Sequence, residues 1–112
     1  MAKVGFVYLL GDLEKEGIYK IGVTTGKIEN RIKKLQTGNS GEIYIVDYFK
    51  SKNPFFVEKW MHKQFLSNRL NGEWFNLQLD NVKTFKSTCE KFEKLYETIN
   101  KNNDIKNKLK YE

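Results

Sequence analysis

The chain has 112 residues, and 20 lysines and arginines against 14 acidic residues give it a formal net charge of +6 at pH 7. A chain of this length buries about two-thirds of its unfolded surface, which is enough for one domain and excludes two. Hydrophobic residues make up 39% and aromatic residues 14%, which excludes a disordered chain. The positive charge predicts a polyanionic partner, either nucleic acid or anionic lipid.

The single cysteine and the single histidine narrow the class of protein further. They exclude an internal disulfide and a structural zinc site, so packing alone must stabilise the fold. We therefore expect the protein to reside in a reducing, intracellular compartment and not to be secreted. This compartment is the cytoplasm or, in a eukaryotic host, the nucleus. The apolar run at residues 4–10 is too short to span a membrane, and no signal-peptide cleavage pattern follows it.

The first third of the chain predicts a hairpin and a helix. Residues 4–10 and 18–24 have the apolar content of strands, and the polar turn 11–17 joins them. Residues 27–37 place apolar side chains at helical spacing, and Gly38 is a plausible helix end. We therefore expect an antiparallel pair of strands followed by a short amphipathic helix.

A third strand and a second helix are predicted next. Residues 42–49 carry apolar side chains on both faces of a strand, which favours a position inside the sheet. Asn53 is a good helix cap, and Pro54 loses no hydrogen bond in a first helical turn. The helix is expected to run through Phe65.

The last part of the chain predicts a short strand at residues 73–77 and a final helix with an apolar stripe over residues 82–99. Residues 102–112 are polar and are expected to form a mobile tail. The predicted fold class is therefore α/β (α+β). We expect a small, mainly antiparallel sheet of three strands that is flanked by helices.

Several polar residues stand where the predicted elements can present them: Tyr8, Tyr19, Lys20, Arg31, Glu58, His62 and Glu73. Glu58 and His62 are four residues apart, so they share one face of a helix, with about 6 Å between their Cβ atoms. Taken singly, each residue fits an ordinary structural role, such as a packing tyrosine or a solvated arginine. Their interest lies in the combination.

Five short motifs contain most of these residues. They are FVY at residues 6–8, YKIG at 19–22, RIKKLQTG at 31–38, EKWMHKQF at 58–65 and GEWF at 72–75. In this order and spacing, the stretch from residue 4 to about 77 resembles the GIY-YIG endonuclease superfamily. The branch it resembles is that of phages and large DNA viruses, which is often described by its DNA-binding domain.

The resemblance implies a DNA endonuclease or nickase that hydrolyses phosphodiester bonds with one divalent metal, Mg²⁺ or Mn²⁺. Tyr8 matches the tyrosine that activates or orients the attacking water, and Arg31 matches the arginine that contacts the scissile phosphate. Glu73 matches the carboxylate that holds the metal, and His62 occupies a helical position where related nucleases use a histidine. Asn76 corresponds loosely to a downstream asparagine of some relatives.

The second motif departs from the family pattern, because Lys20 stands where the tyrosine before Ile-Gly is expected. Tyr19 lies one residue earlier and faces the other side of a regular strand. We expect Lys20 to take the active-site position, where it stabilises phosphate charge or assists proton transfer, and Tyr19 to pack. Tyr8, with an ordinary pKa of about 10, and His62, with one of about 6.5, both remain candidates for the base.

The resemblance also sets the expected organisation and partners. Residues 1–77 form the nuclease-like module, and residues 78–101 form a helix that packs on the same domain. DNA is the expected partner, with Lys27 and Lys34 as further contacts and a homodimer or a protein partner supplying target specificity. Two alternatives stay open: a DNA-binding module of the same fold with little or no cleavage, and a protein-interaction domain.

Overall fold

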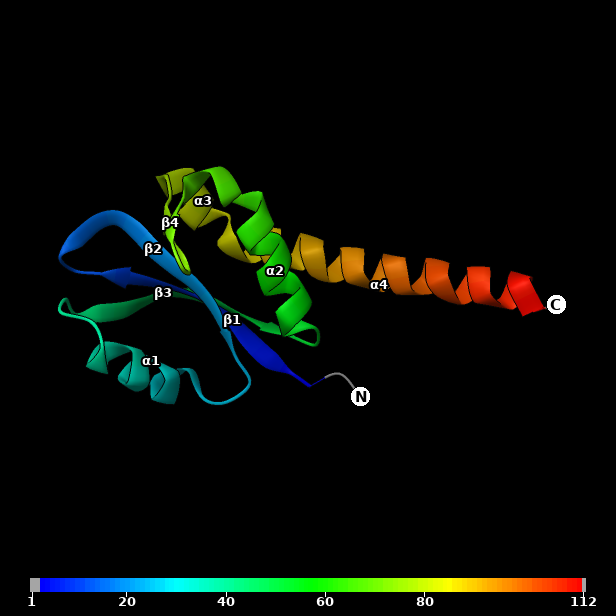
Figure 1. Cartoon of the computed structure of the whole chain (residues 1–112), viewed down its shortest axis with the longest axis horizontal. Helices are drawn as coiled ribbons and strands as arrows, with labels where there is room; N and C mark the ends of the chain where they lie inside the picture. The colour runs from blue at the N-terminus through cyan, green and yellow to red at the C-terminus, as the bar shows by residue number, and fades with distance from the viewer. Residues whose placement is uncertain (1–2, 112) are drawn as a thin grey trace.

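The computed structural model describes the backbone of residues 3–111 and the side chains of residues 3–102. It contains a five-stranded antiparallel sheet with the strand order β3-β1-β2-β5-β4 and helices on both faces (Figure 1). The α+β class is confirmed, but the sheet has five strands where three were expected.

The elements follow the predicted order, with two additions. Their bounds are β1 (Gly5–Asp12), β2 (Lys15–Thr24), α1 (Ile28–Thr37), β3 (Ile43–Ser51), α2 (Pro54–Gln64), the 3-10 turn η1 (Leu66–Asn68), β4 (Arg69–Asn71), β5 (Trp74–Asn76), α3 (Leu79–Lys83) and α4 (Phe85–Tyr111). The strands β1 and β2 remain paired as far as Asp12 and Lys15, so the turn between them is shorter than the turn expected at residues 11–17. The final helix is interrupted between α3 and α4, and α4 continues past residue 101 to Tyr111.

The strand β1 lies inside the sheet, between β3 and β2, and is buried on both faces. Val7 and Leu9 point to the main core, which also contains Met61 of α2 and Phe85 of α4. Tyr8 points to the opposite face, in a smaller cluster that packs against α1. This alternation places Tyr8 on the same side of the sheet as α1.

The strand β3 is an edge strand, which corrects the expectation that residues 42–49 lie inside the sheet. The exposed fractions of Tyr44, Ile45 and Tyr48 are 40%, 40% and 45%. An apolar pattern on both faces is typical of a central strand, but it does not report how many neighbouring strands pair with it. In this chain β3 pairs only with β1, which lies inside the sheet.

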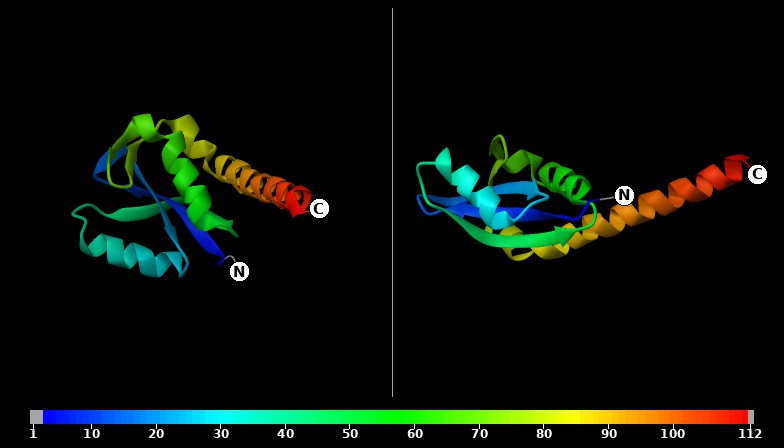
Figure 2. Two further views of the ribbon diagram at one scale, coloured as in Figure 1. Left: turned by 45° about the vertical axis from the view of Figure 1, so that its right-hand side comes forward. Right: turned by 90° about the horizontal axis from the view of Figure 1, so that it is seen from below.

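The helix α4 packs with its first half and then projects from the domain. Phe85, Cys89 and Phe92 are buried in the main core, where α4 contacts α2 and β3. Beyond this contact, α4 continues as a single helix away from the sheet (Figure 2). The first turns of α4 therefore pack on the domain. The expected division at residues 77 and 101 and the mobility of the tail stay predictions, and side chains from residue 103 lie outside the described residues.

The helix α2 begins at Pro54, directly after Asn53, as expected. The Asn53 side chain makes no capping hydrogen bond, so the predicted cap is wrong. Instead, the Asn53 backbone amide donates to Ser51 Oγ at 2.9 Å and to Glu93 Oε1 at 3.2 Å. A carboxylate of α4 therefore fixes the chain where α2 begins.

Polar side chains hold the loop between α1 and β3 against the end of β1. Gln36 Nε2 donates to the carbonyl of Gly41 at 2.8 Å, and Gln36 Oε1 accepts from the amide of Ile43 at 2.8 Å. Asn39 Nδ2 donates to Asp12 Oδ2 at 2.9 Å. These bonds position α1, which carries Arg31, over the sheet.

Candidate functional site

Tyr8 and Arg31 meet over a glycine of β2. Tyr8 pairs with Gly22 across the strands, and its ring lies where a Gly22 side chain would be, since a Cβ atom there would be 2.3 Å from the Tyr8 hydroxyl. Arg31 Nε donates to the Tyr8 hydroxyl at 3.3 Å. Burial raises the pKa of Tyr8 above its ordinary value, although the Arg31 hydrogen bond opposes this. Tyr8 is therefore neutral at pH 7.

Two carboxyl groups and a lysine lie beside this pair. Glu73 directly precedes β5, and its Oε2 is 3.4 Å from Lys20 Nζ on β2. Glu58 of α2 lies beside Glu73, and a carboxylate oxygen of each lies within 4.8 Å of the other. Burial, the charge of Glu73 and hydrogen bonding of the protonated form to Glu73 raise the pKa of Glu58 to about 7, against the opposing charge of Lys20. The lysine of the second motif therefore points at the carboxylate expected to hold the metal.

His62 lies one turn after Glu58 on α2. Its Nε2 is 2.8 Å from the backbone carbonyl of Ile21. Because a carbonyl oxygen only accepts, Nε2 is the protonated donor, and Nδ1 carries the lone pair in the neutral ring. The ring of Phe75 packs against the imidazole, with 5.0 Å between the centroids. Both contacts hold the imidazole in one orientation.

The donor set of Glu58, His62 and Glu73 fits a divalent cation. Each offers one ligand atom, and these atoms all lie within 4.8 Å of one another. Two carboxyl groups in direct contact need either a proton or a cation to offset their repulsion. Carboxylate oxygens suit Mg²⁺ and Mn²⁺, and an imidazole nitrogen is a ligand for transition metals. We call these three residues the carboxylate–histidine cluster.

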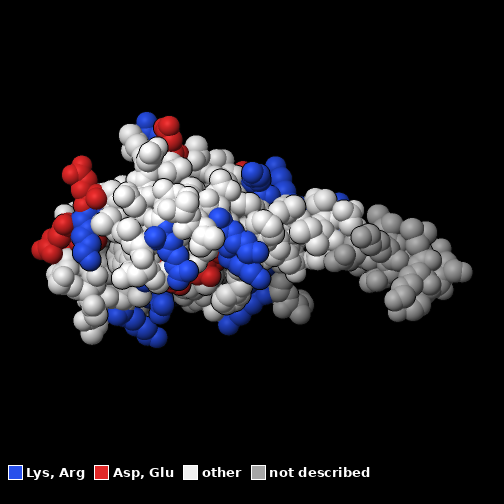
Figure 3. Space-filling model, turned by 45° about the horizontal axis from the view of Figure 1, so that its top comes forward, with Lys and Arg blue, Asp and Glu red and all other residues white. Residues whose placement is uncertain are grey.

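Three clefts with basic side chains surround this cluster. The α2 cleft, of about 450 Å³, is lined by Glu58, Lys59, His62, Lys63, Leu66 and Arg69. The Trp74 cleft, of about 270 Å³, is lined by Lys20, Lys34, Leu35, Gly38, Asn39, Ile43 and Trp74. The α1 cleft, of about 280 Å³, is lined by Thr24, Gly26, Lys27, Asn30, Arg31 and Lys34. In the face drawn in Figure 3, lysine and arginine side chains flank a small acidic spot.

The structure brings together most of the residues that the sequence singled out. Tyr8, Lys20, Arg31, His62 and Glu73 all lie in or beside the carboxylate–histidine cluster. Lys27 and Lys34 are exposed and line the α1 cleft together with Arg31. These positions agree with a phosphate-contacting surface.

Tyr19 and Asn76 lie apart from the cluster. Tyr19 packs against the main core on the opposite face of the sheet, as its place one residue before Lys20 predicts. Asn76 is exposed and pairs with Ile18 at the far end of β5. Glu58 is the residue to which sequence reasoning assigned no role, although its spacing to His62 already placed both on one helical face.

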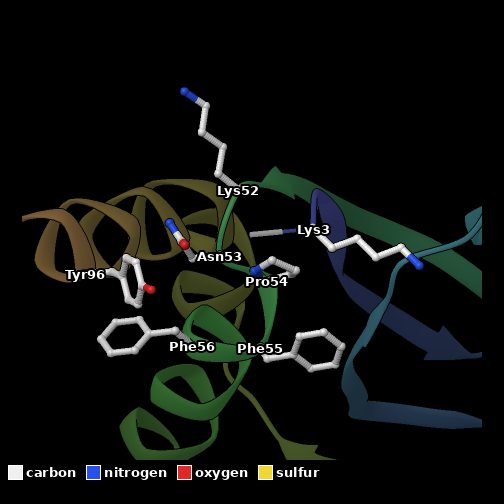
Figure 4. A pocket seen from close by; sticks show the side chains of 7 residues that line it. All are labelled: Lys3, Lys52, Asn53, Pro54, Phe55, Phe56 and Tyr96. Carbon is white, nitrogen blue, oxygen red and sulfur yellow. The ribbon is translucent and has the colours of Figure 1, made fainter. Parts of the chain in front are cut away.

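An apolar hollow of about 210 Å³ lies away from these residues, at the beginning of α2 (Figure 4). It is lined by Lys3, Lys52, Asn53, Pro54, Phe55, Phe56 and Tyr96. The rings of Phe56 and Tyr96 pack edge to face, with 4.9 Å between their centroids. Its two lysines extend away from the aromatic rings (Figure 4), and it holds no carboxylate or imidazole. This hollow therefore lacks the metal-ligating side chains that the carboxylate–histidine cluster contains.

The fold and this cluster define a small α+β domain with an open, cationic site that is built around two carboxyl groups. The family model of the T5orf172 domain matches residues 5–93, and the chain belongs to this family. The T5orf172 domain is phage-associated and related to nuclease-type folds, which agrees with a DNA-binding or nuclease-like role. The match extends into α4, beyond the expected module of residues 1–77.

Comparisons with curated proteins and with solved structures give no match. Within the described part of the chain, no helix combines the length and the apolar character that crossing a membrane requires.

Proposed function

We propose that this chain is a metal-dependent DNA endonuclease or nickase of GIY-YIG type. The observation that carries the proposal is the carboxylate–histidine cluster, whose ligand atoms lie within 4.8 Å of one another beside Lys20, Arg31 and Tyr8. The family match and the net charge of +6 support DNA as the substrate. Target specificity from a homodimer or a protein partner stays a prediction.

Glu58 and Glu73 would hold Mg²⁺ or Mn²⁺ beside His62, and the metal when bound would supply positive charge for the phosphoryl transition state. Arg31 uses Nε on Tyr8, so the other N–H groups of its guanidinium remain for a phosphate. Lys20 adds a second cation next to Glu73. Fixed donors of this kind stabilise the negative charge that develops during cleavage.

Tyr8 is better suited to orienting than to proton abstraction. Its pKa is raised by burial, and its hydroxyl oxygen accepts from Arg31, so its own proton remains to be donated to water or to a phosphate oxygen. The Nε2 proton of His62 is engaged by the carbonyl of Ile21, which leaves Nδ1 as its basic atom. These contacts support Tyr8 as an orienting residue and His62 as the stronger candidate for the base.

The experiment is a nicking assay with supercoiled plasmid and Mg²⁺ or Mn²⁺. We expect Glu73→Gln to lower the rate by on the order of 100-fold, because it removes a ligand from the cluster. Glu90→Gln is the matched control, since Glu90 is exposed on α4, and it should nick at the wild-type rate. Unchanged nicking by Glu73→Gln, or nicking that persists in EDTA, would contradict the proposal.

One observation favours the alternative of a DNA-binding module with little or no cleavage. Lys20 replaces the motif tyrosine and contacts Glu73 at 3.4 Å, where it competes with a cation for the carboxylate. Salt-dependent DNA binding without nicking in either metal would support this alternative. Nicking that emerges in Lys20→Tyr would then identify Lys20 as the cause. The protein-interaction alternative stays an untested prediction.

A further inference from the structure

Trp74 stands next to the site and has no role in the function proposed above. It follows Glu73 directly in the chain and pairs with Lys20 across the strands β5 and β2. Its side chain is half-buried, so part of the indole ring is open to solvent. The Nζ atoms of Lys20 and Lys15 lie 5.2 Å and 5.7 Å from the ring centroid. A tryptophan with two cations is thus held beside the carboxylate–histidine cluster.

This ring forms one wall of the Trp74 cleft. Leu35 of α1 and Ile43 of β3 supply further apolar lining, and Lys20 and Lys34 supply the charged groups. The cleft therefore combines a flat aromatic surface, two aliphatic side chains and two ammonium groups in about 270 Å³. By contrast, the lining of the α2 cleft is basic and includes no tryptophan, tyrosine or phenylalanine.

These features match the chemistry of a single nucleotide. A nucleobase is flat and stacks on an indole ring, while the phosphates on either side of it attract lysine ammonium groups. A base inside a duplex is paired and stacked, so it must leave the duplex before it enters a pocket. The Trp74 cleft therefore suits an unpaired base, whereas the α2 cleft suits a phosphate backbone.

We propose that the Trp74 cleft binds one unpaired nucleobase of DNA, next to the phosphate at the carboxylate–histidine cluster. Trp74 is then a specificity-determining residue that directs the protein to single strands, bulges or flaps. This inference rests on the proposed function and adds the structural class of the substrate. Lys20 links the two sites, because it contacts both Glu73 and the Trp74 ring.

The first test measures DNA binding in EDTA, where no cleavage occurs, by fluorescence anisotropy with a labelled short single strand and with a labelled blunt-ended duplex of two strands. Trp74→Ala should weaken single-strand binding by on the order of tenfold and duplex binding by less than about twofold, while Trp74→Phe keeps most of the affinity. The matched control is Trp60→Phe, because Trp60 packs against Phe92 of the core, and it should bind like the wild type. Circular dichroism shows that each variant is folded.

The second test uses Trp74 as its own reporter. The chain has two tryptophans, so Trp60→Phe leaves Trp74 as the single emitter. Stacking of a base should quench its fluorescence at a saturating concentration of single strand, and the duplex should quench it less. If Trp74→Ala weakens binding of both DNAs equally, or if Trp74 fluorescence is not quenched at saturation, the inference is overturned and the proposed function is not. If the wild-type protein binds neither DNA at low salt, both the proposed function and the inference about the Trp74 cleft are wrong.

Discussion

Gly22→Ala tests whether the position of Tyr8 controls the activity. A Cβ atom at Gly22 would lie 2.3 Å from the Tyr8 hydroxyl and 2.4 Å from Cζ, whereas ordinary contacts begin at 3.4 Å. The ring must therefore move back by about 1 Å from the sheet. Tyr8 is fully buried, so it has little space in which to move.

The size of the effect follows from this overlap. Forcing a methyl group into a packed region costs about 1–3 kcal/mol in the free energy of unfolding. The midpoint of thermal unfolding should fall by about 4 °C for each kcal/mol. Displacing an orienting group by about 1 Å lowers a catalytic rate by on the order of 100-fold. The loss of activity should therefore be much larger than the loss of folded protein at the assay temperature.

The assay compares plasmid nicking and thermal unfolding of Gly22→Ala with those of Gly11→Ala. Gly11 is a matched control, because a Cβ atom there would lie 2.4 Å from Cζ of Tyr44, another tyrosine ring over a glycine. Tyr44 is 40% exposed and does not line any of the three clefts around the cluster, so its ring can turn into solvent and nicking should persist. A folded Gly22→Ala that nicks within about twofold of the wild type would refute the assigned role of Tyr8.

Two further predictions concern the stability of the fold around the site. Hydrogen bonds from the Asn39 side chain and from the backbone amide of Glu14 lower the pKa of Asp12 in the folded protein. The ionised Asp12 therefore stabilises the fold fully above the ordinary carboxyl pKa of about 4. This stabilisation is lost as the pH falls through the lowered pKa of the folded state. Urea unfolding at a series of acidic pH values should therefore show a smaller loss of stability for Asp12→Asn than for the wild type, and equal losses would exclude this linkage. Glu93→Ala should lower the free energy of unfolding by about 1–3 kcal/mol, because the Ser51 hydroxyl loses its acceptor and the Asn53 backbone amide loses one of its two acceptors. The exposed Glu90→Ala should change it by less than about 0.5 kcal/mol, and similar values for both variants would show that the contact is unimportant.

Local periodicity predicted the helices and the longer strands, and it failed where a strand depends on a partner. The strand β4 (Arg69–Asn71) has three exposed residues and no apolar alternation, so only its pairing with β5 identifies it. The edge position of β3 was also hidden, because its apolar residues resemble those of a central strand. Hydrogen bonding between segments that are distant in the sequence decides whether β4 forms and where β3 lies in the sheet. The hydrophobic pattern within a short stretch of sequence does not show such pairing.

The site shows the same division. Motif order named Tyr8, Lys20, Arg31, His62 and Glu73 as candidates, and the strand period correctly separated Lys20 from its neighbour Tyr19. Each of these inferences depends on residue type and on spacing within one element. Contact between Glu58 and Glu73 could not be inferred in this way, because the two residues belong to α2 and to the start of β5.

The sequence by itself determined the size of the domain, its positive charge, the local elements and the chemical groups available for phosphate and metal binding. Tertiary structure decided that β3 is an edge strand with β1 inside the sheet, that Glu58 joins His62 and Glu73, and that Trp74 forms the wall of a cleft beside them. The physical reason is that periodicity acts within one helix or strand. Distances between elements are instead set by how their apolar faces pack together.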